Sequence, residues 1–291
     1  MASIDRMVRI RNELIRCMAS EFYGTFLLVF IAHSTGSAYG FASTGTDKVG
    51  KIMGSTFGVG CAALIALTAA MPVSGGHINP AITVAVASMG HFPWSRVIPY
   101  LVAQHLGGFF AALMVYITFY DPIQGVFTAN AANTTIAAEK TAHMFCSGEA
   151  AGSSAIGSFI GSFWGTAIFL IGIAAILDQK SNMKAPKWYW PLGVSFVLMI
   201  SLAAFGVSGG PSVNPAADLT PRIAASMMGW GSVLWKGHGG HYWWIAGIVG
   251  PHLGAIFGLW SYRFFISAHY PDDEEEARHK NSVELEGLNK P

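Results

Sequence analysis

The sequence predicts an all-α membrane protein built from two inverted halves. Its 291 residues are 52% hydrophobic and only 11% charged, whereas soluble domains carry roughly 25% charged residues. Six apolar stretches are long enough to cross a bilayer, which needs about 20 residues. The triplet Asn-Pro-Ala occurs twice, at 79–81 and at 214–216, in short apolar segments outside those six stretches. The formal net charge of +1 gives no electrostatic basis for nucleic-acid binding.

The six crossings are expected at residues 17–40, 52–73, 97–119, 155–177, 188–208 and 242–268. Together they form a channel-like domain over 17–268, after a cytoplasmic N-terminal segment (1–16) and before a cytoplasmic polar tail (269–291). Repeat one covers about 17–120 and repeat two about 155–268. Because each repeat has three crossings, the second must be inverted relative to the first.

Each triplet reads as the start of a short helix. Asn is a favoured N-cap and Pro suits the first helical turn, as in Asn79-Pro80-Ala81 and Asn214-Pro215-Ala216. Short, Pro-interrupted segments at matching places in two inverted repeats indicate the binding site or pore. We therefore expect two half-helices that enter from opposite faces and meet near the midplane.

The connection between the repeats and the basic residues indicate an orientation. Residues 120–154 are expected to form a long external loop, in which Asn133-Thr134-Thr135 is an acceptor pattern for N-glycosylation whose occupancy stays open. With both termini cytoplasmic, 12 of the 17 Lys and Arg residues fall in cytoplasmic segments and 5 do not. This bias favours cytoplasmic termini, and we expect a plasma-membrane protein.

These residues resemble a known family, the major intrinsic proteins (aquaporins), over roughly residues 12–270. Asp218 after the second triplet, followed by Pro221-Arg222, is similar to the aquaglyceroporin subgroup. Further matching segments are Phe92-Pro93-Trp94, Tyr120-Asp121, Ala175-Ile176-Leu177-Asp178 and Gly229-Trp230-Gly231. The resemblance implies a right-handed bundle of six crossings and two half-helices, a pore in each subunit, a homotetramer in the bilayer, and no cofactor or metal.

The expected pore chemistry follows from the half-helices. Their N-terminal ends carry positive partial charge and free N–H groups, and the amides of Asn79 and Asn214 can donate hydrogen bonds to passing solutes. Exclusion of cations and protons by such ends is an established property of aquaporin-type pores. The approaches to the triplets should supply carbonyls to the lumen, and the residues expected along it are Gly75, Gly76, His77, Ile78, Gly210, Ser212 and Val213. A hydrogen-bonded packing role is the alternative for His77.

Anchoring of the two approach loops is expected to be unequal. Glu21 is an acid inside a crossing, where a charge is costly unless it is satisfied. The resemblance implies that this position holds the N–H groups of the first loop. The matching position in repeat two is Ser162, so the second loop should be held less firmly.

The outer constriction departs most from the family pattern. The resemblance implies an Arg three residues after the second Asn, but this chain has Ala217. The other constriction positions are Val59, Leu202 and Pro211, with Phe57 as an alternative to Val59. We expect a filter that is wider and more apolar than one bearing Arg.

The function expected is passive conduction of water and small uncharged solutes down their gradients. Glycerol is the leading solute, with urea and larger polyols as further ones. A water-selective channel, or a poorly conducting protein with a structural or regulatory role, remains an alternative. No set of nucleophile, base and metal ligands converges in the sequence, so an enzyme is not expected.

Overall fold

The computed structural model describes residues 2–42, 48–181, 183–206 and 212–271, and in those residues it contains helices and loops but no strand. Six described helical segments are long and apolar enough to cross a membrane: Glu13–Ala42, Ile52–Ser74, Trp94–Thr118, Ala155–Leu177, Lys187–Phe205 and Tyr242–His269. Each overlaps one predicted crossing. The predicted all-α membrane fold is confirmed.

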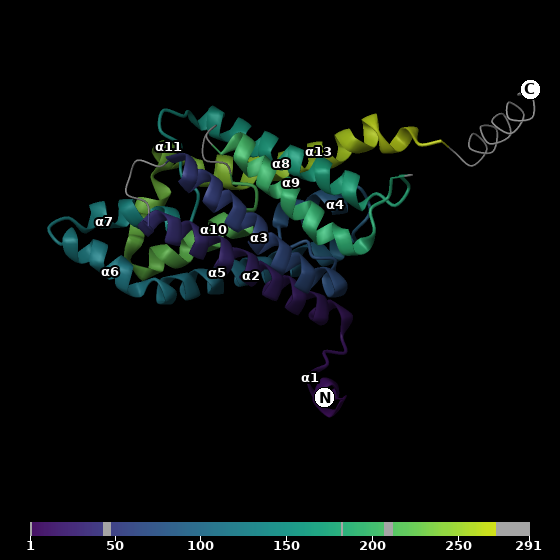
Figure 1. The fold of residues 1–291 in the computed structure, drawn as a ribbon, viewed down its shortest axis with the longest axis horizontal. Helices are drawn as coiled ribbons and strands as arrows, with labels where there is room; N and C mark the ends of the chain where they lie inside the picture. The colour runs from purple at the N-terminus through teal and green to yellow at the C-terminus, as the bar shows by residue number, and fades with distance from the viewer. Residues whose placement is uncertain (1, 43–47, 182, 207–211, 272–291) are drawn as a thin grey trace, which may run out of the picture.

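Repeat one consists of three crossings around a half-helix. Its crossings are α2 (Glu13–Ala42), α3 (Lys48–Ser74) and α5 (Val97–Thr118), and its half-helix is α4 (Pro80–Ser88). Helix α2 packs along both α3 and α5. A short helix, α1 (Ala2–Val8), precedes them and projects away from the bundle (Figure 1).

Repeat two has the same order of elements. Its crossings are α8 (Ala155–Leu177), α9 (Trp190–Phe205) and α13 (Gly250–Phe265), and its half-helix is α10 (Pro215–Ala225). Helix α8 packs along both α9 and α13, as α2 does along its two partners in repeat one.

The repeats are joined through their half-helices. Helix α4 packs against α13 of repeat two, α10 packs against α5 of repeat one, and α3 packs against α9. Figure 1 shows α4 and α10 in opposite halves of the bundle. Each half-helix is therefore held by a crossing of the other repeat.

Glycines permit the same close contact in each repeat. A Cβ at Gly107 of α5 would overlap the carbonyl oxygen of Phe22 in α2, and one at Gly254 of α13 would overlap that of Phe163 in α8. Small residues at helix contacts let backbones approach closely in membranes. The tight packing of the first and third crossings in each repeat depends on them.

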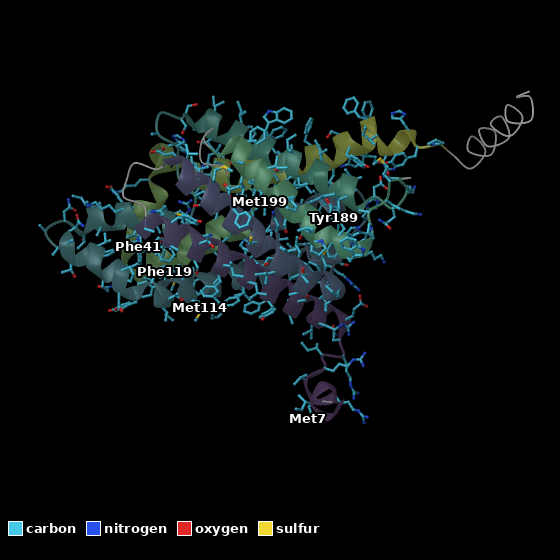
Figure 2. The ribbon with its side chains drawn as sticks, viewed as in Figure 1. Met7, Phe41, Met114, Phe119, Tyr189 and Met199 are labelled. Atoms are coloured by element: carbon cyan, nitrogen blue, oxygen red, sulfur yellow. The ribbon has the colours of Figure 1, made fainter. Side chains whose placement is uncertain are left out.

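The segment between the repeats is more ordered than the predicted loop. It contains α6 (Tyr120–Ala129), α7 (Thr134–Thr141) and a tight turn at Ala142–Met144. Phe41, near the end of α2, stacks on Phe119 just before α6, with ring centroids 6.2 Å apart (Figure 2). The hydrophobic cluster under these helices explains why the chain folds here.

The segment after α10 packs at the same end. It runs through Ser226–Trp230 and Gly231–Trp235 to α11 (Gly237–Gly240), α12 (Tyr242–Trp244) and the wide turn Ile245–Val249. Helices α6, α7 and α11 lie at one end of the bundle, while the start of α2 and the end of α13 lie at the other (Figure 1).

Candidate functional site

The two triplets begin the two half-helices in the same way. Asn79 and Asn214 are extended N-cap residues, and a proline follows each at the first helical position. The Asn79 side-chain oxygen accepts from the Ala81 N–H at 2.9 Å, and that of Asn214 accepts from the Ala216 N–H at 3.1 Å. The Asn214 oxygen also accepts from the Ala217 N–H at 3.4 Å, so each asparagine satisfies at least one of the free donors at its helix start.

The same asparagines also connect the two repeats. The Asn79 amide nitrogen donates to the Val213 carbonyl at 2.9 Å, and the Asn214 amide nitrogen donates to the Ile78 carbonyl at 2.9 Å. The half-helices therefore meet head to head, with their positive ends facing one junction. Because an amide has two N–H groups, each asparagine keeps one for another partner.

A cavity of about 650 Å³ runs past this junction and is lined by both asparagines. Its wall includes six of the predicted lumen residues, namely Gly75, Gly76, His77, Ile78, Ser212 and Val213. Gly210, a further predicted lumen residue, lies outside the described residues. The structure thus brings segments more than 130 residues apart to one narrow space.

Backbone conformations in the first approach explain its glycines. Gly75 and Gly76 have φ angles of 89° and 65°, which favour glycine. A Cβ at Gly76 would also press against Met71. Ile78 has a φ of 42°, an unfavourable value for a β-branched residue, and its carbonyl is the one that receives Asn214.

Glu21 accepts four hydrogen bonds, three of them from residues 74–78 at the first approach loop. Its carboxylate accepts from the N–H groups of His77 (2.9 Å) and Ile78 (2.6 Å). It also accepts from the Ser74 hydroxyl at 2.7 Å and the Gln104 amide at 2.8 Å. All four neighbours donate, so this fully buried site suits an acceptor with two oxygens.

Gln104 extends this network toward the half-helix. Its amide nitrogen also donates to the Thr83 hydroxyl at 2.9 Å, and a His77 ring nitrogen lies 3.2 Å from that same hydroxyl. His77 therefore lines the cavity and is hydrogen-bonded within the protein at the same time. The sequence reasoning missed Gln104 and Thr83, whose only signal was a polar side chain in an apolar segment.

Ser162 makes a single contact to the second loop. Its hydroxyl accepts from the Ser212 N–H at 3.2 Å. A Cβ at Gly250 would come within 2.9 Å of the Ser162 Cβ, so α13 packs directly over this position. The two loops thus differ in anchoring among the described residues, with three hydrogen bonds to Glu21 on one side and one to Ser162 on the other.

Asp218 and Arg222 form a buried ion pair beside the second half-helix. The Arg222 guanidinium lies 2.9 Å from an Asp218 oxygen, and both side chains are at most 3% exposed. The pair also binds Ser147, since Arg222 donates to its carbonyl at 2.8 Å and Asp218 accepts from its N–H at 2.8 Å. A further Arg222 hydrogen bond goes to the Leu234 carbonyl. The pair ties α10 to the segments on either side of it.

Comparison with known proteins decides the family. The family model described as "Major intrinsic protein" matches residues 9–262. The chain belongs to the major intrinsic protein family. It is similar to aquaporin-9 of Homo sapiens, at 31% identity over 94% of this chain and 90% of that protein. It is also 30% identical to aquaporin-3 of Milnesium tardigradum, over 94% of this chain and 83% of that protein.

A solved structure has the same fold. The aquaglyceroporin of Plasmodium falciparum aligns with a TM-score of 0.74 and 21% identity, over 88% of this chain and 98% of that chain. Members of the family are passive channels for water and small solutes such as glycerol. The chain is accordingly a multi-pass channel protein and not an enzyme.

The positions expected to form the outer constriction carry apolar side chains where the structure describes them. Val59, Leu202 and Ala217 all line the cavity, while Pro211 lies outside the described residues. Phe57, the alternative to Val59, is 62% exposed and does not line the cavity. Arg222 does not line it either, because its guanidinium is held by the ion pair.

The glycosylation pattern lies at a helix start. Asn133 caps α7, and its side-chain oxygen accepts from the Thr135 N–H at 3.1 Å. The residue is exposed on the segment that connects the repeats. Modification of this asparagine stays a prediction.

Proposed function

We propose that the chain is a passive channel for water, glycerol and other small uncharged solutes, including urea and larger polyols. The observation that carries this proposal is the cavity that passes the head-to-head junction of the two half-helices. The Asn79 and Asn214 amides line it with one N–H each to spare. A hydroxyl or carbonyl oxygen can accept these hydrogen bonds without a change in the protein.

The composition of the wall supports polyols over water alone. The cavity carries polar groups at the junction, while apolar side chains such as Leu67, Phe169 and Leu198 form much of the rest of its wall. A polyol has hydroxyls that need partners and CH groups that do not. An apolar wall lowers the cost of desolvating the CH side.

The missing Arg supports a wider solute range. With Ala217 at the constriction, neither the bulk nor the permanent charge of an Arg side chain enters the lumen. Exclusion of cations then rests on the two half-helix ends, which face one another across the junction. Val59 and Leu202 contribute only CH groups to passing solutes.

The orientation in the membrane, the cellular location and the oligomeric state also form part of the proposal. The arginines near the N-terminus, Arg6, Arg9, Arg11 and Arg16, cluster at one end of the bundle, and basic clusters favour the cytoplasmic side. This supports cytoplasmic termini, and we propose the plasma membrane as the location. A homotetramer would cover part of the exposed apolar helix surface. Surface labelling of intact cells and the mass of the complex in mild detergent test these two points.

Reconstitution into liposomes tests the conduction proposal. Stopped-flow light scattering would follow the volume change of protein-containing and empty liposomes in gradients of sucrose, glycerol, urea and five- or six-carbon polyols. We expect protein-dependent entry of glycerol and urea. Water flux without solute entry would indicate the water-selective alternative, and equal rates in both liposomes would indicate a non-conducting protein.

Ala217→Arg tests the constriction, with Ala217→Met as a control that adds length without charge. We expect the Arg variant to exclude the largest polyols that the wild type conducts while it retains water flux. A Met variant that narrows the range equally would show that size alone matters. An unchanged solute range in both variants would refute the wider filter.

A further inference from the structure

His33 is a polar residue at the Ala217 end of the cavity that the predicted constriction does not include. It lies in the middle of α2 and lines the cavity together with Val59, Leu202 and Ala217. The last three have no polar side-chain atom, so His33 is the one polar side chain among the four. We call these four residues the constriction ring.

Packing between α2 and α3 places His33 near Val59 along the pore. A Cβ at Gly58 of α3 would overlap the side chain of Thr35 in α2. Thr35 is two residues after His33, and Gly58 immediately precedes Val59. The two helices therefore cross at the level of these ring members.

Packing between α3 and α9 brings Leu202 to a similar level. A Cβ at Gly60 would overlap the side chain of Met199, which is labelled on α9 in Figure 2. Gly60 immediately follows Val59, and Met199 lies about one helical turn before Leu202. The four residues of the constriction ring thus come from the crossings α2, α3 and α9 and from the half-helix α10.

One ring nitrogen of His33 is held by a distant part of the chain. Its Nδ1 lies 2.9 Å from the Met144 carbonyl oxygen, in the turn after α7. When Nδ1 donates its hydrogen there, a neutral imidazole leaves Nε2 as an acceptor. Ala217 and Asp218 line the same cavity as the His33 imidazole.

The Ala217 carbonyl has lost its usual helical donor. In an α-helix the N–H four residues later donates to each carbonyl, but that residue is Pro221, inside α10, and proline has no N–H. A main-chain acceptor and an imidazole therefore lie together at the constriction. With the hydrogen on Nδ1, both Nε2 and this carbonyl accept hydrogen bonds from the O–H or N–H groups of a molecule in the lumen.

Space for such a molecule exists next to the His33 imidazole. Gly36 lies about one turn after His33 on α2 and also lines the cavity. Among the described residues, a Cβ at Gly36 would meet no atom within 4 Å, so this part of the wall leaves open space. A side chain at this position would narrow the space beside the imidazole.

We propose that His33 is the solute-orienting residue of the constriction, where its Nε2 exchanges hydrogen bonds with the hydroxyl or N–H groups of uncharged polyols and ureas. Val59, Leu202 and Ala217 contact the apolar side of the same solute. This role rests on the proposed channel function. The crossing helix α2 then supplies the polar contact at the constriction. An Arg at the Ala217 position would have supplied it from the second half-helix.

The chemistry of this contact differs from that of an Arg. A guanidinium only donates hydrogen bonds and is always charged, whereas an imidazole nitrogen can accept as well. A neutral acceptor suits solutes that carry O–H or N–H donors. It offers no attraction to small anions.

Two isosteric substitutions separate the two ring nitrogens. His33→Asn keeps a nitrogen near the Nδ1 position, able to donate to the Met144 carbonyl, and removes Nε2. His33→Gln keeps a polar group near the Nε2 position and gives up the Met144 contact. His105→Leu is the matched control, because His105 is a half-buried histidine of α5 that binds its own helix at the Leu101 carbonyl, 2.7 Å away, and does not line the cavity.

The measured quantity is the ratio of solute to water permeability in liposomes, for glycerol and for urea. One neutral hydrogen bond contributes on the order of 1 kcal/mol, which corresponds to about a fivefold change in rate. We expect His33→Asn to lower the ratio about fivefold. His33→Gln should keep it within about twofold of wild type, and His105→Leu should leave it unchanged.

The possible outcomes separate this role from the channel function itself. If the wild type conducts solute and His33→Asn keeps the wild-type ratio, the role of His33 is refuted while the channel function stands. If His33→Gln loses as much as His33→Asn, a polar group near the Nε2 position does not restore the ratio, and solute contact through Nε2 is refuted. If the wild type conducts no solute, both proposals fail together. Should His33→Asn not fold, the same ratio in His33→Leu decides between these outcomes.

Discussion

Replacing Glu21 with Gln tests how firmly the first approach loop is anchored. Glu21 accepts four hydrogen bonds with two oxygens, from Ser74, His77, Ile78 and Gln104. A Gln keeps one oxygen and turns an NH₂ group toward two of these donors. Two of the hydrogen bonds donated to the carboxylate are lost whichever way the amide points, although on the Ser74 side the hydroxyl can turn and accept from the NH₂ group.

The size of the effect follows from those two bonds. A hydrogen bond to a charged acceptor contributes about 1.5–3 kcal/mol, so the gross loss is about 3–6 kcal/mol. Gln also avoids the cost of burying a charge, which moves the expected net loss toward about 3 kcal/mol. For a chain of this size that corresponds to a fall in melting temperature of roughly 6–12 °C.

The second repeat supplies the matched control. Ser162 occupies the position that corresponds to Glu21 and holds one loop N–H, that of Ser212, at 3.2 Å. Ser162→Ala removes a single neutral hydrogen bond, so we expect a loss of about 1 kcal/mol, or roughly 2–4 °C. The difference between the two variants measures the asymmetry of the loops.

Thermal unfolding of both variants in one detergent, followed by tryptophan fluorescence, measures these shifts. Glu21→Asp serves as a second control, because it keeps the charge but shortens the reach. The reasoning would be refuted if Ser162→Ala lowered the melting temperature as much as Glu21→Gln. It would also be refuted if Glu21→Gln had no effect.

Three further predictions use the same unfolding measurement. Arg222→Met leaves the Asp218 carboxylate buried without its partner, so we expect a loss of about 3–5 kcal/mol; a loss under about 1 kcal/mol would show that the pair contributes little. Gly76→Ala should lower the free energy of unfolding by at least about 1 kcal/mol, because the φ of Gly76 is 65°. Its control is Gly125→Ala inside α6, where no described atom would crowd the new Cβ; this variant should stabilise the protein slightly. Asn133→Gln should lower the stability by about 1 kcal/mol through loss of the α7 cap, and in a glycosylating host it should also increase gel mobility if a glycan is attached.

Much of the fold could be predicted because membrane insertion imposes strong rules on the sequence. A crossing must be apolar over about 20 residues and must satisfy its backbone internally, so all six crossings are visible as apolar stretches. The two half-helices are visible because their start signals, Asn79-Pro80 and Asn214-Pro215, depend only on local backbone geometry. The segment 120–154 was harder to interpret, because its helices are short and polar and are stabilised by packing under them.

The residues of a site formed by contact between distant segments were only partly predictable. The resemblance to a family pattern gave Glu21 and Ser162, while Gln104 and Thr83 could not be distinguished from other polar residues in apolar helices. Their roles arise because α2, α4 and α5 converge on one buried carboxylate. Convergence of this kind is a property of packing, which no local pattern encodes.

The sequence by itself determined that the chain crosses a membrane six times in two inverted repeats and that two short helices begin at matching asparagines. The crossings and the half-helix starts follow from hydropathy and helix capping, which act over a few neighbouring residues. The inversion follows from the odd number of crossings in each repeat. Only the tertiary structure decided that each asparagine donates to the opposite loop, that Arg222 is committed to Asp218, and that His33 lines the same cavity as Val59, Leu202 and Ala217. The physical reason is that such contacts depend on the relative positions of helices, and those are set by close packing at glycines such as Gly58 and Gly60 together with hydrogen bonds between residues more than 100 positions apart.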